Sequence, residues 1–477
     1  MIHFLMNHFY IRLKIVKKTL LITLIFIQIS TSFNAQNARS LYFLNDWSQR
    51  HTLNASFAPE YGQFSLPLIG GVNMNLSSNA GLSNFIYQTN NQLVTFLNPS
   101  VDGHEFLNKL SPNEYFDQGM NLNIFSFGFK TKNAFWSVDC SFSENLNLNI
   151  PYDLFRLMKM AHESQTNVFD LKNLSMTQSN FGTLSVGYSR DINSKIRVGV
   201  NAKLIVGLSS ERIKYNQFDI TMANDKFEIN AEGESLLMSK ILSFGKDQNS
   251  YYDFSKPVFD FSFQNPAGIG AGIDLGISYQ PIKQLKLAAG INDLGFINWD
   301  SKSIKKGVAQ TNFNFTGFTI VSLDSIGNIS KQLTQLQNDA AKLVQFQEQP
   351  AVTQNIIERI PYTFNISAEY SIFDNKDRDI RIGLLWNSYN TPSLQKNELI
   401  AAVTMKPFTW FSFSTTYAIV KNDNNRLGLA LNFSPKWVNF FLASDFITNK
   451  FNKQLLPINK FDINMHAGIS FYLGNDQ

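Results

Sequence analysis

The final strand-like stretch of the chain, FDINMHAGISFYL at residues 461–473, alternates apolar and polar side chains without a break. A period of two puts the apolar side chains on one face of a β-strand and the polar ones on the other. The stretch also exceeds the ~9–11 residues that a tilted strand needs to cross a bilayer. The same alternation recurs at residues 134–149, 195–208 and 359–373. It predicts repeated strands with two unlike faces.

The connections between these strands distinguish a membrane barrel from a soluble sandwich. Short polar connections alternate with longer ones along the whole chain, as in outer-membrane barrels with tight periplasmic turns and long external loops. We therefore expect an all-β fold, a fourteen-stranded antiparallel transmembrane β-barrel (12–16 strands fit) in the outer membrane, with both termini periplasmic. The expected strands are residues 65–79, 119–130, 134–149, 176–190, 195–208, 268–279, 284–293, 359–373, 379–389, 398–405, 408–420, 426–433, 437–446 and 460–473.

The composition agrees with a barrel and argues against other classes of protein. Charged residues make up 16% of the chain, below the ~25% of soluble domains. We find no apolar run of the ~18 residues that a spanning helix requires. The formal net charge is +4, but four of the basic residues lie in residues 1–35, which hold no acid. The rest of the chain is formally neutral, which argues against a nucleic-acid partner.

The N-terminus has the pattern of an export signal. A basic start is followed by an apolar core at Thr19–Ile29 and by a cleavage position after Ala35, so residues 1–35 are predicted to be a signal peptide; a retained signal anchor is the alternative. Residues 36–64 precede the first strand and are long enough to fold into the lumen as a plug. Residues 65–477 then form the barrel.

Four stretches outside the expected strands have patterns of their own. Residues 151–163 and 328–349 carry apolar side chains at helical spacing, which predicts short amphipathic helices in external loops. Such helices either cap the mouth of the barrel or only cover their own loops. Residues 216–235 and 311–321 alternate like strands, and we interpret them as hairpins within external loops.

The polar phase of the strands identifies candidate lumen-facing residues. Their charges are of mixed sign, which suggests pairing across a filled interior rather than an ion-selective pore. Gly268, Gly270 and Gly272 recur at every second position, followed by Gly276, so this strand lacks inward side chains; another backbone approaches it there, or the strand bends. The candidates are Arg197, Lys203, Gly268, Gly270, Gly272, Asp274, Lys286, Glu369, Arg381, Asp462 and His466.

Tryptophan positions give a separate indication of a membrane interface. Trp136, Trp410 and Trp437 each begin an expected strand just after a short turn. All three are therefore expected at the same end of the barrel, where outer-membrane barrels carry a girdle of aromatic residues. Ordinary pairing between strands is the alternative explanation.

The sequence contains no pattern that indicates catalysis. Neither G-x-S-x-G nor H-E-x-x-H occurs, and His51, His104, His162 and His466 lie in different expected elements. The glycines near residue 270 follow G-x-G-x-G inside a strand, which is not the dinucleotide-binding pattern. Cys140 is the only cysteine, so cysteine-rich metal sites are excluded. We predict a protein that is not an enzyme, with no cofactor and no metal.

One region resembles a known family. Gly272-Ile273-Asp274-Leu275-Gly276 is followed by Leu294-Gly295-Phe296-Ile297-Asn298-Trp299. These runs are similar to those of a Bacteroidetes outer-membrane barrel family without an assigned activity. That family resembles the fourteen-stranded FadL-like barrels, which include long-chain fatty-acid transporters and the PorV-type subunit of type IX secretion. The recognisable runs cover only about residues 265–300, whereas the layout matches over most of the mature chain.

The resemblance implies two functions of different classes. The first is FadL-like binding or passage of a hydrophobic small molecule. The alternative is a PorV-like barrel that transports nothing and binds secreted proteins or a secretion complex. The expected partners are outer-membrane lipid and either a hydrophobic ligand or secretion-system proteins. Apolar residues inside the lumen favour the first function, and a large external surface favours the second.

Overall fold

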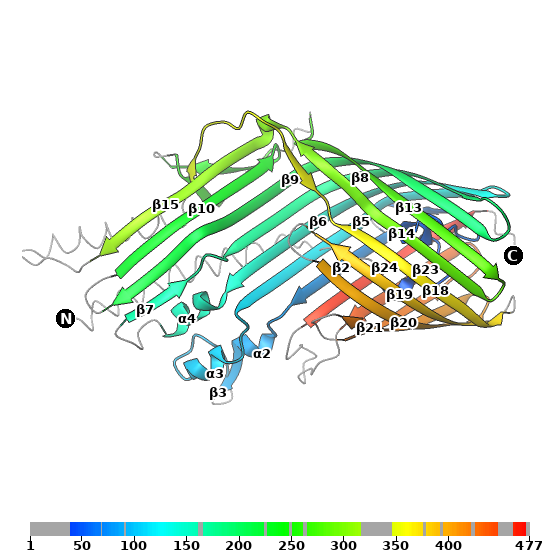
Figure 1. Cartoon of the computed structure of the whole chain (residues 1–477), viewed down its shortest axis with the longest axis horizontal. Helices are drawn as coiled ribbons and strands as arrows, with labels where there is room; N and C mark the ends of the chain where they lie inside the picture. Colours follow the sequence, from blue (N-terminus) through cyan, green and yellow to red (C-terminus); the bar gives the residue numbers. More distant parts are fainter. Residues whose placement is uncertain are drawn as a thin grey trace, which may run out of the picture.

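The computed structural model describes residues 39–67, 69–89, 92–160, 166–223, 227–247, 250–260, 265–315, 346–374, 378–391, 395–420, 425–446 and 461–473. Fourteen antiparallel strand positions close into a barrel (Figure 1), which confirms the predicted fold class. In order around the barrel they are β1 and β2 together (Gly62–Ser65, Gly71–Ser78), β5 (Asn113–Lys130), β6 (Ala134–Pro151), β8 (Ser175–Asp191), β9 (Ile196–Ala223), β13 (Gly268–Ile282), β14 (Leu285–Trp299), β18 (Tyr362–Asp374), β19 (Asp379–Asn390), β20 (Gln395–Phe408), β21 (Phe411–Val420), β22 (Arg426–Phe433), β23 (Val438–Phe446) and β24 (Phe461–Leu473).

The first and last strands close the barrel. β24 pairs with β1, where Tyr472 opposes Gln63, and with β2, where Ala467 opposes Val72. The same two strands pair with β5 on their other side. The predicted first strand, residues 65–79, is therefore interrupted between β1 and β2. Pro67 lies in this interruption and lacks the amide hydrogen that a continuous ladder needs.

The outer wall of the barrel is apolar, and the inner wall is mostly polar. In β21, Tyr417 is 44% exposed on the outside, whereas Ser414 on the opposite face is fully buried. Leu384 and Trp386 of β19 likewise face outward and are exposed. An exposed apolar band around a closed antiparallel barrel matches the hydrocarbon core of a membrane. This is the fold of an outer-membrane barrel.

One side of the barrel continues far beyond its rim. β9 extends to Ala223 and pairs there with β7 (Thr166–Asp170) and β10 (Phe227–Ser239), and β10 pairs with β15 (Ile304–Phe315). Figure 1 shows these strands reaching past the rest of the barrel. We call β7, β9 beyond Gly207, β10 and β15 the overhanging sheet. It contains residues 216–223, 227–235 and 311–315 of the two stretches that we expected as separate loop hairpins, whereas residues 224–226 and 316–321 lie outside the described part of the chain. The hydrogen-bonded ladder continues from the barrel strand, although the phase of the alternation changes after residue 208.

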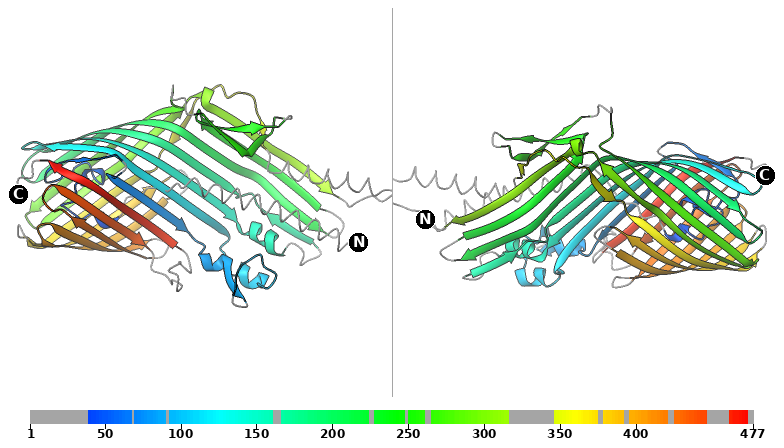
Figure 2. Two further views of the ribbon diagram at one scale, coloured as in Figure 1. Left: turned by 180° about the vertical axis from the view of Figure 1, so that it is seen from behind. Right: turned by 45° about the horizontal axis from the view of Figure 1, so that its top comes forward.

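Smaller elements complete the structure (Figure 2). The predicted helix at 151–163 is observed as α4 (Tyr152–Met160). The predicted helix at 328–349 lies largely outside the described residues. Near its end, residues 347–348 form the short strand β16 instead. The remaining elements are η1 (Arg39–Leu41), η2 (Arg50–Thr52), α2 (Leu82–Phe85), β3 (Ile86–Thr89), β4 (Gln92–Thr95), α3 (Gly103–Leu107), β11 (Leu242–Lys246), β12 (Tyr252–Phe259), η3 (Ser301–Ser303), β16 (Gln347–Glu348) and β17 (Ile356–Arg359).

No helix among the described residues is long and apolar enough to span a membrane. The predicted signal peptide, residues 1–35, lies outside the described part of the chain.

Candidate functional site: the barrel lumen

The chain from residue 39 to residue 61, which we call the N-terminal segment, lies inside the barrel (Figure 1, dark blue). Leu41, Leu44 and Trp47 have no exposed surface. They form one apolar cluster with side chains of the barrel wall, among them Ile400 and Phe441. A segment packed this way is part of the protein core and occupies the lumen near the short turns.

A buried network of charges holds the beginning of the segment. Arg39 forms an ion pair with Glu398 of β20, with 2.7 Å between Nη2 and Oε1, and its backbone amide donates to Asp445. Glu398 also pairs with Arg426, and Arg426 with Asp462. All these side chains are at most 7% exposed. Removing one partner would leave an uncompensated buried charge, which makes this contact costly to break.

Polar contacts fix the rest of the segment to strands on all sides. Ser412 Oγ donates to the carboxylate of Asp46 (2.7 Å), and His51 Nε2 lies 3.1 Å from Asp139 of β6. The side chain of Asn54 donates to the carbonyl of Ala289 (3.0 Å). The segment therefore contacts opposite sides of the lumen at once.

Burial also affects two ionisable groups of the segment. It raises the pKa of the Tyr42 hydroxyl to about 12, because the phenolate is poorly solvated there. It lowers the pKa of Arg50 to about 10 for the same reason. Both groups keep their usual protonation state at neutral pH, so the segment carries the charge of Arg50 into the lumen.

Glycines in the wall make room for the segment, and one of those in the predicted glycine face, Gly276, is among them. A Cβ on Gly199 would lie 1.9 Å from the carbonyl oxygen of Ala55, and one on Gly276 would lie 2.1 Å from Asn54 Oδ1. Gly268, Gly270 and Gly272 lie further along β13. A Cβ there would meet Ile297, the backbone of Phe296 or Ile205. The N-terminal segment therefore approaches β13 at Gly276, whereas Gly270 lies against the backbone of the neighbouring strand β14.

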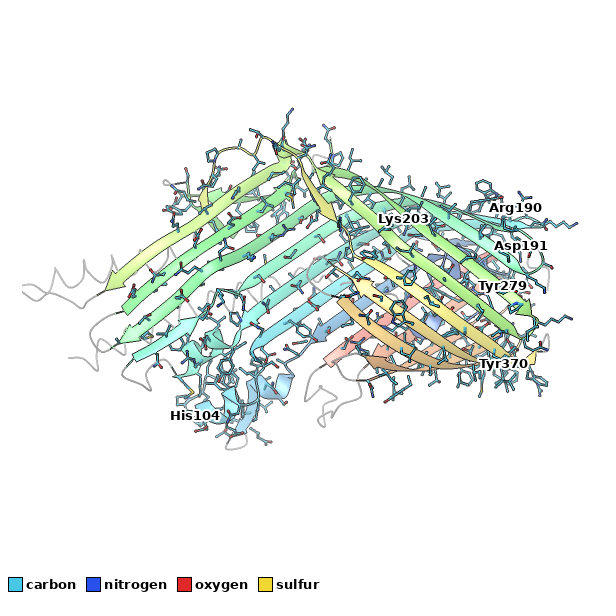
Figure 3. All side chains as sticks on the ribbon, viewed as in Figure 1. His104, Arg190, Asp191, Lys203, Tyr279 and Tyr370 are labelled. Atoms are coloured by element: carbon cyan, nitrogen blue, oxygen red, sulfur yellow. The ribbon has the colours of Figure 1, made fainter. Side chains whose placement is uncertain are left out.

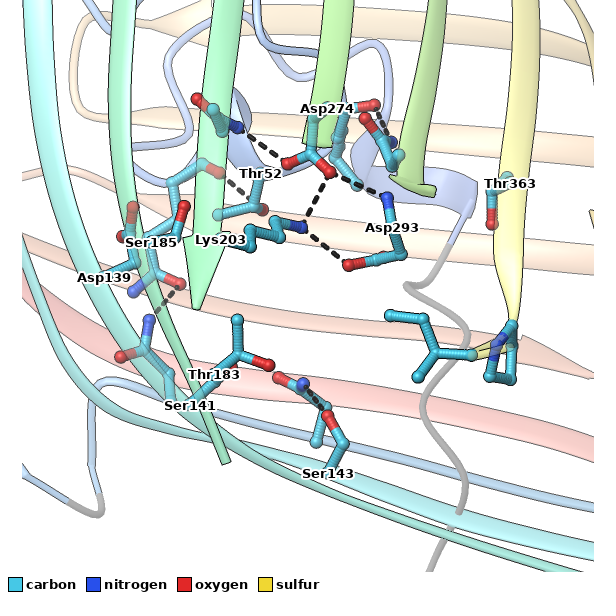
Figure 4. Close-up of a pocket in the computed structure, with 18 of the residues that line it drawn as sticks. Thr52, Asp139, Ser141, Ser143, Thr183, Ser185, Lys203, Asp274, Asp293 and Thr363 are labelled. Atoms are coloured by element: carbon cyan, nitrogen blue, oxygen red, sulfur yellow. Dashed lines mark hydrogen bonds and ion pairs between the residues drawn. The ribbon is translucent and has the colours of Figure 1, made fainter. Parts of the chain in front are cut away.

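A cavity of about 180 Å³ lies in the lumen beside the N-terminal segment. Figure 4 shows that hydroxyl and amide side chains from several strands converge on it. Its apolar lining residues include Phe181, Ile360 and Leu385. The polar lining residues include Asn121, Asn123, Ser141, Ser143, Thr183, Ser185, Asn201, Asn292, Thr363, Asn365, Asn387 and Tyr389.

Two of the predicted lumen residues meet in this cavity. Lys203 Nζ lies 2.8 Å from Asp274 and 2.6 Å from Asp293 (Figure 4), and Asn201 also donates to Asp274 (2.8 Å). The residue Asp293 has a φ of 63°, in the left-handed region that non-glycine residues rarely adopt. It belongs to a β-bulge, since the register between β13 and β14 shifts at Asp274. The bulge turns the Asp293 carboxylate towards Lys203.

The wall next to the cavity has a weakened seam. The pairing of β14 with β18 ends at Asn292–Thr363, and its pairing with β17 begins at Phe296–Arg359. Between them the amide of Ile360 donates to the carbonyl of Gly295 at 3.2 Å. Pro361 has no amide hydrogen to contribute. Both Ile360 and Pro361 line the cavity.

Of the other predicted lumen residues, His466 also lines the cavity and the rest are not among its lining residues. Lys286 stacks on Phe57 of the segment, 4.5 Å from the ring centroid. Trp47 packs edge-on against His466, with 5.6 Å between the ring centroids. The remaining predicted side chains form these ion pairs: Arg197 with Asp191 (2.8 Å), Arg381 with Glu369 (3.7 Å) and Asp462 with Lys396 (3.2 Å).

The three predicted girdle tryptophans lie on the outer wall beside short turns. Trp136 is 41% exposed and packs on Tyr188, Trp410 stacks on Phe408, and Trp437 stacks on Phe471. Figure 3 shows Tyr279 and Tyr370 at the same end of the barrel as Arg190 and Asp191, which flank the turn before β9. Aromatic side chains are therefore collected at the short-turn end.

Sequence reasoning missed the residues that hold the segment. Arg39, Glu398 and Arg426 were not among the candidates, although the last two lie on the polar phase of their strands. Charges at the beginning of the strands could have been included on that ground. Within the described residues, no group of three or more His, Cys, Asp and Glu side chains is placed to hold a metal ion.

Known structures resemble the chain in fold at very low identity. The toluene transporter TodX of P. putida is 9% identical, with a TM-score of 0.39 over 92% of this chain and 94% of that one. A TodX deltaS2S3 mutant monoaromatic hydrocarbon channel is 9% identical, with a TM-score of 0.43 over 93% and 97%. A Pseudomonas aeruginosa FadL homologue is 8% identical, with a TM-score of 0.36 over 93% and 99%.

Comparison by sequence assigns the chain to a family. No curated protein matches it. The model of one family matches residues 55–445, which run from the N-terminal segment to β23. Since this is most of the chain, the protein belongs to DUF5723, a family of unknown function.

Proposed function

We propose that the protein is an outer-membrane barrel that binds and passes a small molecule, hydrophobic in part, and that its N-terminal segment closes the lumen. The short turns and both termini then face the periplasm, as in other single-chain barrels. The observation that carries the proposal is the cavity, which lies between the N-terminal segment and the weakened seam at Ile360–Pro361.

The lining of the cavity restricts what such a molecule is. Asn, Ser and Thr side chains dominate the lining, so a pure hydrocarbon would leave their polar groups without partners. Apolar atoms, among them those of Phe181, Ile360 and Leu385, nevertheless contribute about as much of the cavity surface as polar atoms do. An amphipathic molecule fits both parts, with its polar end in the cavity and its apolar part towards the seam.

Photo-crosslinking tests this function. A long-chain alcohol that carries a diazirine is bound to the barrel in lipid nanodiscs, and crosslinked peptides are identified by mass spectrometry. We expect crosslinks to the peptides that contain Phe181 and Ile360–Pro361, and we expect an excess of unlabelled alcohol to abolish them. Crosslinks confined to outward residues such as Leu384 and Trp386 would show membrane partitioning only and contradict the proposal.

The overhanging sheet supports a second candidate function. It has a core of its own, which includes Phe169, Tyr215, Ile220 and Ile229, and it carries exposed side chains such as Glu232 beyond the rim. A rigid surface of this kind suits the PorV-like alternative, in which the barrel binds secreted proteins. A photoreactive residue at position 232 should then capture a secreted protein in cells, whereas one at the short turns should not.

A further inference from the structure

We infer that the lumen cavity binds an uncharged, ring-sized, hydroxyl-bearing group. The inference rests on the proposed function and names the chemistry of the polar end of its ligand. It follows from three properties of the cavity: its charges are already paired, some of its buried acceptors are not, and its volume suits a single ring.

The charged groups at the cavity already have ion-pair or hydrogen-bond partners. Lys203 contacts both Asp274 and Asp293 at 2.6–2.8 Å, and Arg39 is bound to Glu398. Asp139 lies 3.1 Å from His51 and accepts a hydrogen bond from Ser126 (2.6 Å). A charged ligand would have to break one of these pairs or remain unpaired in a confined space, and both are costly. An uncharged ligand avoids this cost.

Two buried amide oxygens at the cavity have no hydrogen-bond donor among the described residues. They are Asn123 Oδ1 and Asn292 Oδ1, and these residues are only 9% and 6% exposed. The orientation of each amide is set by its nitrogen. Asn292 Nδ2 donates to the carbonyl of Leu53 (2.7 Å), and Asn123 Nδ2 donates to Gln49 Oε1 (3.4 Å). Each oxygen has almost no accessible surface, so a ligand reaches it only when the side chain turns towards the cavity. A ligand hydroxyl then supplies the missing donor, and a carboxylate does not.

The size and the mixed lining of the cavity define the rest of the ligand. An engineered apolar cavity of ~150 Å³ is large enough for benzene, so a cavity of about 180 Å³ accommodates one six-membered ring. The hydroxyls of Thr183 and Thr363 both donate and accept, which suits several hydroxyl groups around that ring. Phe181 and Leu385 provide apolar surface for a ring face.

The test compares three ring-sized probes that differ in charge. Methyl glucoside is neutral, glucuronate is an anion and glucosamine is a cation at pH 7. Each is titrated against the full mature chain in lipid nanodiscs, with saturation-transfer NMR and calorimetry as readouts. We expect methyl glucoside to bind, and both charged probes to bind at least tenfold more weakly. Equal or tighter binding of a charged probe would overturn the inference, and so would the absence of methyl glucoside binding.

Matched variants locate the binding. Thr183→Val and Thr363→Val remove a cavity hydroxyl at nearly constant volume, and each should weaken methyl glucoside binding at least threefold. Thr416→Val is the control, since Thr416 is a buried lumen hydroxyl outside the cavity. Equal loss in the control, or no loss in either cavity variant, would place the probe elsewhere and overturn the inference. Failure here leaves the crosslinking result intact, so the two proposals fail separately.

Discussion

The replacement of Gly199 by valine should release the N-terminal segment without damage to the barrel. A Cβ at this position would lie 1.9 Å from the carbonyl oxygen of Ala55, whereas ordinary contacts begin at 3.4 Å. The segment would therefore have to move by about 1.5 Å, the difference between these two distances. Valine is itself favourable in a strand, so the strain falls on the segment.

The size of the effect follows from the hydrogen bonds near Ala55. A shift of about 1.5 Å would break the bonds from Asn54 to Ala289 O, now 3.0 Å, and from Asn292 to Leu53 O, now 2.7 Å. Each contributes about 0.5–1.5 kcal/mol, so docking of the segment weakens by about 1–3 kcal/mol. The ratio of released to docked segment should then rise about 5- to 150-fold.

Efflux of a small polar dye from proteoliposomes measures this change. We expect faster efflux with Gly199→Val than with the unaltered protein. Gly182→Val is the matched control, because a Cβ on Gly182 has its nearest neighbour at 3.9 Å. If the folded Gly199→Val variant released the dye no faster than Gly182→Val, this result would refute the reasoning.

Three further predictions concern the barrel itself. Leu384→Arg places a charge on the lipid-facing side near the middle of β19 and should destabilise the barrel by about 2–4 kcal/mol. Reversible unfolding from vesicles measures this loss, which should be much larger than the loss with Ser143→Arg at the cavity. Similar losses for the two variants would contradict the assigned faces. Glu398→Ala leaves Arg39 and Arg426 without their shared partner and should cost about 3–5 kcal/mol of stability in the same assay. Glu105→Ala is the control, because it removes only an exposed i,i+4 ion pair with Lys109, and it should cost under about 1 kcal/mol. In single-tryptophan variants, lipids brominated near the headgroup should quench Trp136, Trp410 and Trp437 more than Trp386, and deeply brominated lipids should do the reverse; no depth difference would argue against a girdle.

The strands and their faces could be predicted because each depends on local alternation. The period of two continues through β24, β18 and the part of β9 up to residue 208, and the membrane requires apolar side chains on one face. The same signal misled at β9, where the strand continues 15 residues past the predicted end at residue 208 to Ala223. The phase of the alternation changes after residue 208, which predicts the end of a strand, whereas the hydrogen-bonded ladder continues through register shifts.

The site was harder to predict because it depends on contacts between distant residues. Glycine at every second position indicated a close approach to β13, but only packing shows that Gly276 receives the segment while Gly270 meets Phe296 of the neighbouring strand. Arg39 and Glu398 are 359 residues apart, and no local pattern links them. The cavity is lined from many strands, so its polar character emerges only once the barrel is closed.

Single-channel recording in planar bilayers tests most directly whether the N-terminal segment closes the lumen. The full mature chain should show little steady conductance, because residues 39–57 pack against opposite walls of the barrel. Deletion of residues 39–57 should produce stable, larger openings. Large steady channels in the intact chain, or a deletion variant that folds and remains silent, would contradict the account.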